Sequence, residues 1–387
     1  MTVPGGEHPA RTVGTTGTNG ATGATGTAGA AKSARRPTLA VIGATGAVGR
    51  VLVELLATRA DMWGEVRLFA GPEGIGTEVP VLGRAEPVRA LEPGCFEGVD
   101  IALFEAPEDV VEHWAPLAVA AGAVAVDGSA AFRLHPDVPL VVPEINPSAA
   151  RMRRIGIVAA PRCATLVLTV ALAALHAEFG LSRLVVTAAL AASGRGRIGV
   201  DTLRRQTAEV AGDPTVGTRT GDLRRAVSEQ DDDPFEAPLA YNLLPWAGDA
   251  AEEGWSSEEL GLRNETRKIL GLPELPISAT CLRVPVVSGH SLTVHAVFER
   301  EPDVHRVREI LDSSAGVVVY DDPDKGEYPT PADVVGSDPT WVGRVRRSLD
   351  EPNGLELFLC GDNLRKGAAL NCVQIAELVA AEDPAHA

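Results

Sequence analysis

The sequence predicts an α/β protein with two sheets, the first mostly parallel and doubly wound, the second of mixed type. Between positions 37 and 160, short apolar runs alternate with helical patterns, and this order is typical of a mostly parallel sheet. After position 180 the apolar runs become longer and partly alternating, which indicates mixed or antiparallel strands. A glycine-rich turn joins the first strand to the first helix.

Length and charge exclude several classes of protein. The 387 residues suffice for two domains. The net charge is −17 and the basic residues are scattered, so no nucleic-acid partner is expected, and an anionic substrate needs a local basic pocket. No apolar run is long enough to span a bilayer, so no membrane association is expected. The five cysteines are Cys95, Cys163, Cys281, Cys360 and Cys372. They are dispersed and form no metal-binding pattern, so we expect the protein to work in a reducing cytoplasm.

Residues 1–36 differ in composition from the rest of the chain. They consist mainly of Gly, Thr and Ala, and we expect them to be disordered because they can bury too little apolar surface. They contain no apolar core of a secretory signal. The segment GATGATG at 20–26 imitates a nucleotide-binding loop, but neither a strand nor an amphipathic helix flanks it.

The stretch LAVIGATGAVGRVLVELLA, from residue 39, predicts a dinucleotide-binding turn. A buried strand at 39–42 leads into GATGAVG at 43–49, and apolar residues then recur at helical spacing. Glycines permit the tight turn and a close approach to a pyrophosphate, and the helix N-terminus offers free N–H groups. The predicted cofactor contacts are Gly43, Thr45, Gly46, Ala47, Val48 and Gly49. The alternative is a glycine-rich turn that binds nothing.

The remaining elements follow in order along the chain. The first sheet continues with predicted strands at 66–70, 99–106, 123–127, 139–146 and 155–160 and a helix at 107–121. The second sheet takes strands at 183–192, 277–287, 291–299 and 354–361. The Pro-, Gly- and acid-rich segment 212–260 is interpreted as a surface connection, and 363–381 as an amphipathic helix that returns to the first domain. The predicted domains are therefore 1–36 (tail), 37–160 (dinucleotide-binding), 161–361 (catalysis and dimerisation) and 362–387 (returning helix).

Cys163 is the candidate nucleophile. It stands at the predicted start of an apolar helix, where the dipole favours a thiolate, and Arg162 adds a neighbouring cation. The alternative is a small, packed apolar residue, which is the common state of a free cysteine. The other four cysteines lack such surroundings and are interpreted as structural. His290, beside Gly289, is the best acid/base partner.

Three further charged residues complete the predicted constellation. Arg283 could bind a carboxylate through two parallel hydrogen bonds. Glu265 and Lys268 share a helix face, where the alternative is an ordinary surface ion pair.

These segments together resemble the aspartate-semialdehyde dehydrogenase family. The resemblance runs from about residue 37 to 381 and rests on VIGATGAVG, FRLHPDVPLVVPEIN, NETRKIL, ISATCLRVPVVSGHS and DNLRKGAALN. It implies a Rossmann-type domain and a mixed-sheet domain that carries catalysis and a homodimer interface. The implied reaction is the reduction of β-aspartyl phosphate with NADPH to aspartate semialdehyde and phosphate, on the route to lysine, diaminopimelate, methionine and threonine.

The resemblance also assigns roles. Cys163 is implied as the nucleophile that forms a thioester, and His290 as the acid/base group. The implied substrate contacts are Arg283 and Glu265 for the amino-acid end, and Arg133 and Lys268 for the phosphate. Asn363 joins the implied cofactor contacts.

The chain departs from the family pattern at several positions. Arg162 and Ala164 replace the usual Asn and Ser or Thr around the cysteine, and Leu190 replaces a glutamine. Gly71 and Glu73 replace the Ser and Arg that meet the cofactor 2′-phosphate, so Glu73 favours NAD over NADP. Glu105-Ala106-Pro107-Glu108 replaces a loop of small residues. Three interpretations stay open: a working dehydrogenase with relaxed or NAD-type cofactor use, a paralogue acting on a related acyl phosphate or aldehyde, and a non-catalytic relative.

Overall fold

The computed structural model describes residues 35–228 and 230–382. The predicted disordered tail and the imitation loop at 20–26 lie almost wholly outside these residues. Within the described ranges no helix is both long and apolar enough to cross a membrane, and no group of His, Cys, Asp and Glu is arranged to hold a metal ion.

The first sheet has seven strands in the order β3-β4-β2-β1-β5-β6-β7. The strands are β1 (Leu39–Ile42), β2 (Val66–Phe69), β3 (Glu78–Val81), β4 (Arg84–Arg89), β5 (Ile101–Phe104), β6 (Val124–Asp127) and β7 (Ile157–Ala159). All pair in parallel except β3, which runs antiparallel to β4. β1 lies in the middle and is buried throughout, as expected of a strand with helices on both faces. The predicted doubly wound parallel sheet is confirmed.

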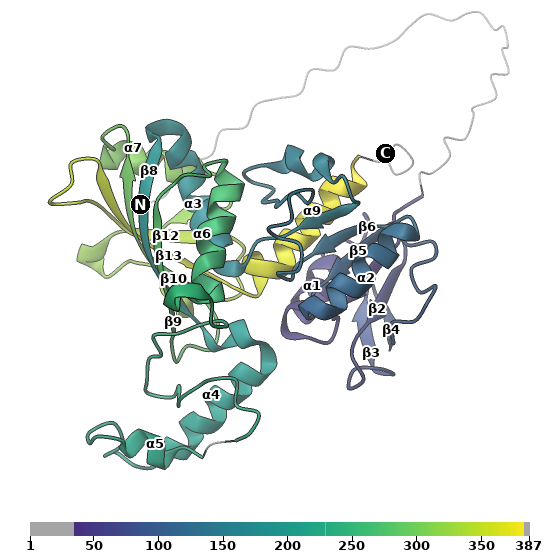
Figure 1. The fold of residues 1–387 in the computed structure, drawn as a ribbon, viewed down its shortest axis with the longest axis horizontal. Coiled ribbons are helices and arrows are strands. Elements are labelled where there is room, and N and C mark those ends of the chain that lie inside the picture. Colours follow the sequence, from purple (N-terminus) through teal and green to yellow (C-terminus); the bar gives the residue numbers. More distant parts are fainter. Residues whose placement is uncertain (1–34, 229, 383–387) are drawn as a thin grey trace, which may run out of the picture. The chain divides into compact units, whose positions relative to one another are not determined.

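Three helices cover this sheet: α1 (Ala47–Ala57), α2 (Glu108–Ala120) and α9 (Asn371–Ala380). α9, drawn in yellow in Figure 1, contacts β5 and β6 although it comes from the far end of the chain. Its apolar side chains Val373, Ile375 and Ala376 are buried in the same cluster as Val41 and Leu103 of the sheet. A π-helical turn, Arg365–Leu370, precedes α9.

The segment 139–146 is not the predicted strand. Only Leu140 forms a single bridge, to Ala159. The Asn146 side chain replaces the missing ladder: its Oδ1 accepts from the Val142 N–H at 2.8 Å, and its Nδ2 donates to the Leu140 carbonyl at 2.9 Å. Prolines at 139 and 143 lack the N–H groups that a strand needs.

The second sheet has six strands in the order β11-β12-β13-β10-β8-β9. The strands are β8 (Leu181–Leu190), β9 (Ile277–Arg283), β10 (His290–Phe298), β11 (Val317–Val319), β12 (Thr340–Arg347) and β13 (Gly354–Gly361). β8 pairs with β9 and β11 with β12 in parallel, and the other pairs are antiparallel. The predicted mixed sheet is therefore confirmed, with β11 and β12 as additional strands.

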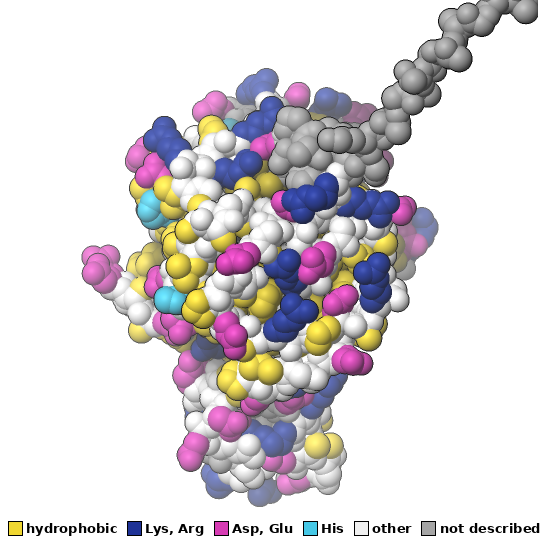
Figure 2. Space-filling model, turned by 90° about the vertical axis from the view of Figure 1, so that its right-hand side faces the viewer, with side chains coloured by type: hydrophobic (Ala, Val, Ile, Leu, Met, Phe, Trp, Pro, Cys, Tyr) yellow, Lys and Arg dark blue, Asp and Glu magenta, His cyan; other side chains and the backbone are white. Residues whose placement is uncertain are grey.

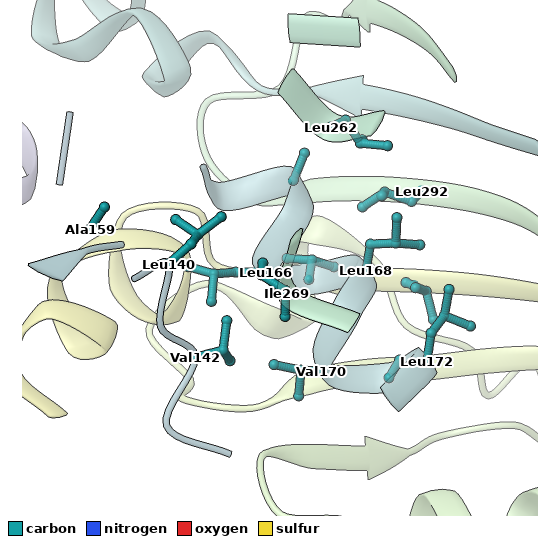
Figure 3. Close-up of a cluster of buried hydrophobic side chains, with 14 of the residues drawn as sticks. Leu140, Val142, Ala159, Leu166, Leu168, Val170, Leu172, Leu262, Ile269 and Leu292 are labelled. Carbon is teal, nitrogen blue, oxygen red and sulfur yellow. The ribbon is translucent and has the colours of Figure 1, made fainter. Parts of the chain in front are cut away.

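The helix α3 (Cys163–Phe179) forms the core beside this sheet. Nearly all its residues are buried, because it packs against α6 (Ser257–Leu270), α7 (Val304–Ser313) and the strands at once. Figure 3 shows Leu166, Leu168 and Leu172 of α3 among Leu262 and Ile269 of α6 and Leu292 of β10. A helix apolar on every side is expected to be buried in this way. The rigid start of α3 fixes the position of Cys163.

The segment 212–260 is more than the predicted surface connection. It follows α4 (Gly196–Val210) and includes α5 (Asp222–Ala226), which Figure 1 shows together below the second sheet. Phe235, Leu239 and Leu244 are buried against α4 in a small separate core. The side chain of Gln206 accepts a hydrogen bond from the Leu239 N–H at 2.7 Å. The remaining α-helix of the described residues is α8 (Pro331–Val334), and short 3-10 helices lie at Pro147–Met152, Ala192–Arg195, Glu252–Gly254 and Pro323–Lys325.

Basic and acidic side chains are mixed on the face of the molecule that Figure 2 shows. On the face drawn in Figure 2, Lys and Arg side chains lie next to Asp and Glu, with apolar residues between them.

Candidate active site

Cys163 and His290 form the centre of the candidate site. Cys163 is the first residue of α3 and follows β7 after a short turn, whereas His290 is the first residue of β10. The Cys163 Sγ lies 3.4 Å from the His290 Nε2. Gly289 precedes the histidine with φ +93°, where a Cβ would meet Pro331 at 3.0 Å, so a glycine is needed there. The structure therefore brings together the predicted nucleophile and its predicted partner.

The hydrogen bond on the other side of the imidazole fixes its tautomer. The backbone N–H of Ala191 donates to His290 Nδ1 at 3.2 Å. Nδ1 is thus an acceptor, and the neutral ring carries its proton on Nε2, facing the sulfur. In this state His290 donates toward Cys163 and can stabilise a thiolate or a developing oxyanion.

The charge state of the pair differs from the sequence-based expectation. Burial, with a smaller contribution from the Glu258 charge, raises the pKa of the Cys163 thiol to about 11, and the opposing charges of Arg133 and Arg162 do not compensate. Burial and the positive charge of Arg283 lower the pKa of His290 to about 3. The helix start and Arg162 therefore do not produce a thiolate in the free protein. The resting pair is a thiol and a neutral imidazole.

Arg283 lies beside this pair at the end of β9. The guanidinium Nη1 donates to the Ala191 carbonyl at 2.9 Å, so the same residue orients both Arg283 and His290. Gly194 gives both side chains their room, because a Cβ there would lie 2.7 Å from the Arg283 Nη1 and 3.4 Å from the His290 ring. Sequence reasoning did not identify Gly194, although the run SGRGR contained the signal.

Arg133 is held in the site by backbone carbonyls. Its Nε donates to Ala160 at 2.9 Å and its Nη2 to Gly128 at 2.6 Å. Lys268 lies behind it and donates from Nζ to the carbonyls of Arg133, His135 and Val138. Three acceptors occupy the three ammonium protons, so Lys268 fixes the loop that carries Arg133.

Glu265 is engaged by Arg162. The Arg162 Nε donates to the Glu265 Oε1 at 2.7 Å, and the Arg162 backbone N–H donates to the Oε2 at 2.8 Å. Glu265 is 1% exposed, and its Oε1 also lies 3.7 Å from the Arg133 Nη1. The surface ion pair of Glu265 with Lys268, which was the alternative to a binding role, is not formed: Glu265 pairs with Arg162, and Lys268 donates to backbone carbonyls. Sequence reasoning missed the Arg162–Glu265 pair because its partners lie 103 positions apart.

The walls of a cavity of 610 Å³ contain most of the predicted catalytic, substrate and cofactor residues. Among the described residues, its lining includes Gly46, Ala47, Val48, Gly49, Arg133, Cys163, Arg283, His290 and Asn363, together with Leu190, Glu105 and Glu258. Glu265 and Lys268 are not among these lining residues. The structure therefore separates the six predicted catalytic and substrate residues into four on the cavity wall and two behind it.

The glycine-rich turn fits a dinucleotide. Gly43 has φ +89° and no space for a Cβ, which would lie 2.0 Å from the Glu105 carbonyl oxygen. A Cβ on Gly49 would lie 2.1 Å from the Gly43 oxygen. α1 begins at Ala47 with no side-chain cap and no acidic residue in its first turn, so its N–H groups are open to an anion. A second cavity of 1220 Å³, lined by Thr45 and Glu73, shares Gly46, Ala47 and Gly196 with the first.

Asn363 joins the two halves of the site. Its Nδ2 donates to the Ser193 Oγ at 2.9 Å, and its Oδ1 accepts from the Gly289 N–H at 2.9 Å. Asn363 is 2% exposed and stands before the π-helical turn that leads to α9. Its contacts therefore hold the His290 segment against the segment that returns to the first sheet.

Glu105 lies where the resemblance implied a small residue. A Cβ on Gly128 would lie 2.4 Å from the Glu105 Oε1, so the adjacent glycine makes the room that this carboxyl needs. The Cys372 thiol donates to the same oxygen at 3.0 Å. Cys372, interpreted as structural, thus also lines the cavity. Burial raises the pKa of the Glu105 carboxyl to about 7.

The raised pKa of Glu105 predicts that the free energy of unfolding depends on pH. Because its pKa in the folded protein exceeds the ordinary 4.5, the stabilisation is complete below pH 4.5 and declines as the pH rises to about 7. The loss is on the order of 3 kcal/mol. Glu105→Gln removes it, so the unfolding free energy of the variant relative to the original protein should rise across this window in urea titrations. Glu108→Gln, an exposed carboxylate of the same loop, should show no such trend; equal trends in both variants would contradict the assignment.

Comparison with known proteins identifies the class that this fold and site define. Residues 38–152 match the family model described as "Semialdehyde dehydrogenase, NAD binding domain" and residues 172–366 match "Semialdehyde dehydrogenase, dimerisation domain". The aspartate-semialdehyde dehydrogenase of Streptomyces akiyoshiensis is 43% identical over 334 residues, covering 86% of this chain and 95% of the relative, and that of Corynebacterium melassecola is 42% identical over 337 residues, covering 85% and 95%. The chain belongs to the aspartate-semialdehyde dehydrogenase family.

A solved structure supports the same assignment. Aspartate semialdehyde dehydrogenase II from Vibrio cholerae, complexed with ASA, superposes with a TM-score of 0.83 at 34% identity. The match covers 90% of this chain and 99% of that chain.

Proposed function

We propose that this chain is an aspartate-semialdehyde dehydrogenase that reduces β-aspartyl phosphate to aspartate semialdehyde and phosphate with NADPH. The observation that carries the proposal is the Cys163–His290 pair at 3.4 Å in a cavity that also contains Arg283, Arg133 and the glycine-rich turn. A cysteine nucleophile, two guanidinium groups and a dinucleotide loop are the parts that this reaction needs.

The Cys163 thiol attacks the acyl phosphate: the C–S bond of a thioester forms as the C–O bond to phosphate breaks, and the thiol proton passes to the departing phosphate, which leaves as hydrogen phosphate. The Nε2–H of His290 stabilises the attacking sulfur and the oxyanion of the tetrahedral intermediate. Arg283 binds the α-carboxylate of the substrate, and Arg133 binds the phosphate, each as a guanidinium pre-oriented by backbone carbonyls. Lys268 and Glu265 act behind these groups, by holding the Arg133 loop and the backbone N–H that precedes Cys163.

The turn 43–49, the open N-terminus of α1 and Asn363 would hold the dinucleotide. When bound, NADPH supplies the hydride that reduces the Cys163 thioester. His290 then provides the hydrogen bond at the aldehyde oxygen as the sulfur departs.

We also propose a homodimer that works in the cytoplasm. The match to a dimerisation-domain model over 172–366 supports the dimer. All five cysteines are free in the structure, which agrees with a reducing compartment. We propose the domain boundaries predicted from the sequence. The boundary at residues 160 and 161 is supported by the last strand of the first sheet, which ends at Ala159, and by α3, which begins at Cys163.

Turnover of the purified protein tests the proposal. Aspartate semialdehyde and phosphate are supplied with NADP or NAD in separate reactions, and reduced cofactor is followed by absorbance. We expect turnover that disappears in Cys163→Ala. Absence of turnover with both cofactors, together with no cofactor binding by calorimetry, would favour the alternative of a paralogue with another substrate or a non-catalytic relative.

The charge of Glu73 is expected to affect the relative affinities for NADP and NAD. Its carboxylate is exposed in the larger cavity and lies 3.6 Å from the Arg197 guanidinium, with Arg50 on the same wall. Glu73→Gln removes a charge that repels a 2′-phosphate, and NADP affinity is expected to rise by about 2–5-fold while NAD affinity stays equal or falls. Calorimetric titration with each cofactor measures this. An equal change for both cofactors would place Glu73 away from the ribose.

A further inference from the structure

One face of α6 carries three residues that meet the active site. Glu258, Gly261 and Glu265 are spaced by three and four positions, so they form one stripe along the helix. Arg162, the residue before the nucleophile, lies against this stripe and contacts both carboxylates. The stripe therefore places two carboxylates beside the residue that precedes the nucleophile.

Arg162 takes Glu265 out of reach of the substrate. The carboxylate receives the Arg162 Nε at 2.7 Å and the backbone N–H at 2.8 Å, so both oxygens are engaged. The position of the Arg162 guanidinium depends on the residue at 261 of α6, because a Cβ on Gly261 would lie 2.0 Å from the guanidinium carbon. Only a glycine at 261 leaves room for this guanidinium. Glu265 is also 1% exposed and does not line the cavity beside Cys163.

Glu258 is the remaining carboxylate of the stripe, and it lines that cavity. It lies one turn beyond Gly261 toward the start of α6, is 30% exposed, and has its Oε1 3.3 Å from the Arg162 Nη1. After burial, its charge is the largest cause of the raised pKa of the Cys163 thiol. The other carboxylate on the wall, Glu105, is engaged by the Cys372 thiol and packs against Gly128 at the cofactor turn.

We propose that Glu258, and not Glu265, binds the ammonium group of the substrate. The α-ammonium of an aspartyl substrate is attached to the carbon that bears the carboxylate, so its acceptor must stand beside Arg283. Glu258 shares the cavity with Arg283 and Cys163 and is 30% exposed. Glu265 is 1% exposed, and both of its oxygens already accept hydrogen bonds from Arg162. Arg162 thus determines amine recognition by moving it from one helical turn of α6 to another. This inference rests on the function proposed above.

Two semialdehydes test the proposal. Aspartate semialdehyde and succinic semialdehyde differ in the amino group, so the ratio of their kcat/KM values reports recognition of the ammonium. In Glu258→Gln, kcat/KM for aspartate semialdehyde should fall about 10–100-fold and that for succinic semialdehyde less than about 3-fold. The loss should appear mainly in KM, and Glu258→Asp should restore part of it. Glu252→Gln, an exposed carboxylate outside the cavity, removes the same charge and should leave the ratio unchanged.

Each outcome has a distinct meaning. A ratio that collapses in Glu258→Gln alone supports the proposal. A ratio that Glu258→Gln does not alter overturns it and leaves the proposed function intact, since the enzyme still turns over aspartate semialdehyde. Equal use of both semialdehydes by the unaltered protein also overturns it, because no ammonium is then recognised. Absence of turnover with either compound refutes the proposed function, and this inference with it.

Discussion

Cys163→Ser is expected to lower kcat/KM for aspartate semialdehyde by about 10³–10⁴-fold or more. The serine hydroxyl would occupy the same position, but it loses its proton far less readily than a thiol and is a far weaker nucleophile. The measurement is initial-rate turnover with phosphate and the preferred cofactor, with folding checked by circular dichroism.

Trapping separates this chemical effect from a structural one. With aspartate semialdehyde and oxidised cofactor but no phosphate, the acyl group should remain on the enzyme and appear by mass spectrometry on the peptide that contains Cys163. Cys95→Ser is the control, because Cys95 lies in a loop away from the cavity and is only partly buried. Activity within 10-fold of the original in Cys163→Ser, or an acyl group on another cysteine, would refute the nucleophile assignment.

Local signals predicted much of the fold and the centre of the site. The strand–turn–helix order around Gly43 and the apolar run after Cys163 each identify an element from contiguous residues. Arg283 and His290 are likewise close in sequence, at the end of β9 and the start of β10. Where neighbouring residues alone determine the position of an element or a side chain, that position could be predicted from the sequence.

The errors arose where a nearby side chain or a distant segment competes for the same group. Segment 139–146 looks like a strand, but the Asn146 side chain satisfies its backbone instead. Glu265 and Lys268 have the spacing of binding residues, but Arg162 and three carbonyls occupy them. Neither partner set can be read from residue spacing, because each depends on how α6 packs against the loops before α3.

The pKa values show a similar limit. Helix position and a neighbouring arginine both favour a thiolate, yet burial raises the pKa of Cys163 to about 11 and that of the structural Cys360 to about 11 as well. Acidity therefore does not distinguish the nucleophile from a packed cysteine in the free protein. The cavity and the imidazole at 3.4 Å do.

Arg162→Met is expected to lower the free energy of unfolding by about 3–5 kcal/mol, because it leaves the buried Glu265 carboxylate without its main partner. Glu265→Gln should cost less, since Arg162 keeps its contacts with Glu258 and the Ser257 carbonyl. Glutamine can also still accept from the residue-162 N–H. The double variant Arg162→Met/Glu265→Gln should therefore be more stable than Arg162→Met alone.

Urea titrations of all four proteins close a double-mutant cycle around the pair. The exposed pair Arg306–Glu309, at 3.0 Å, serves as the control, and Arg306→Met should cost no more than about 1 kcal/mol. If Arg162→Met also costs under about 1 kcal/mol, or if the two single effects simply add, the buried pair does not fix Glu265. In that case Glu265 would be free to meet a substrate and Gly261 would need another explanation. A strong coupling would mean instead that the Arg162 guanidinium, next to the nucleophile, stabilises the fold. Replacing it with the asparagine that the family resemblance implies at this position would then also require changes at Glu258, Gly261 or Glu265 of α6.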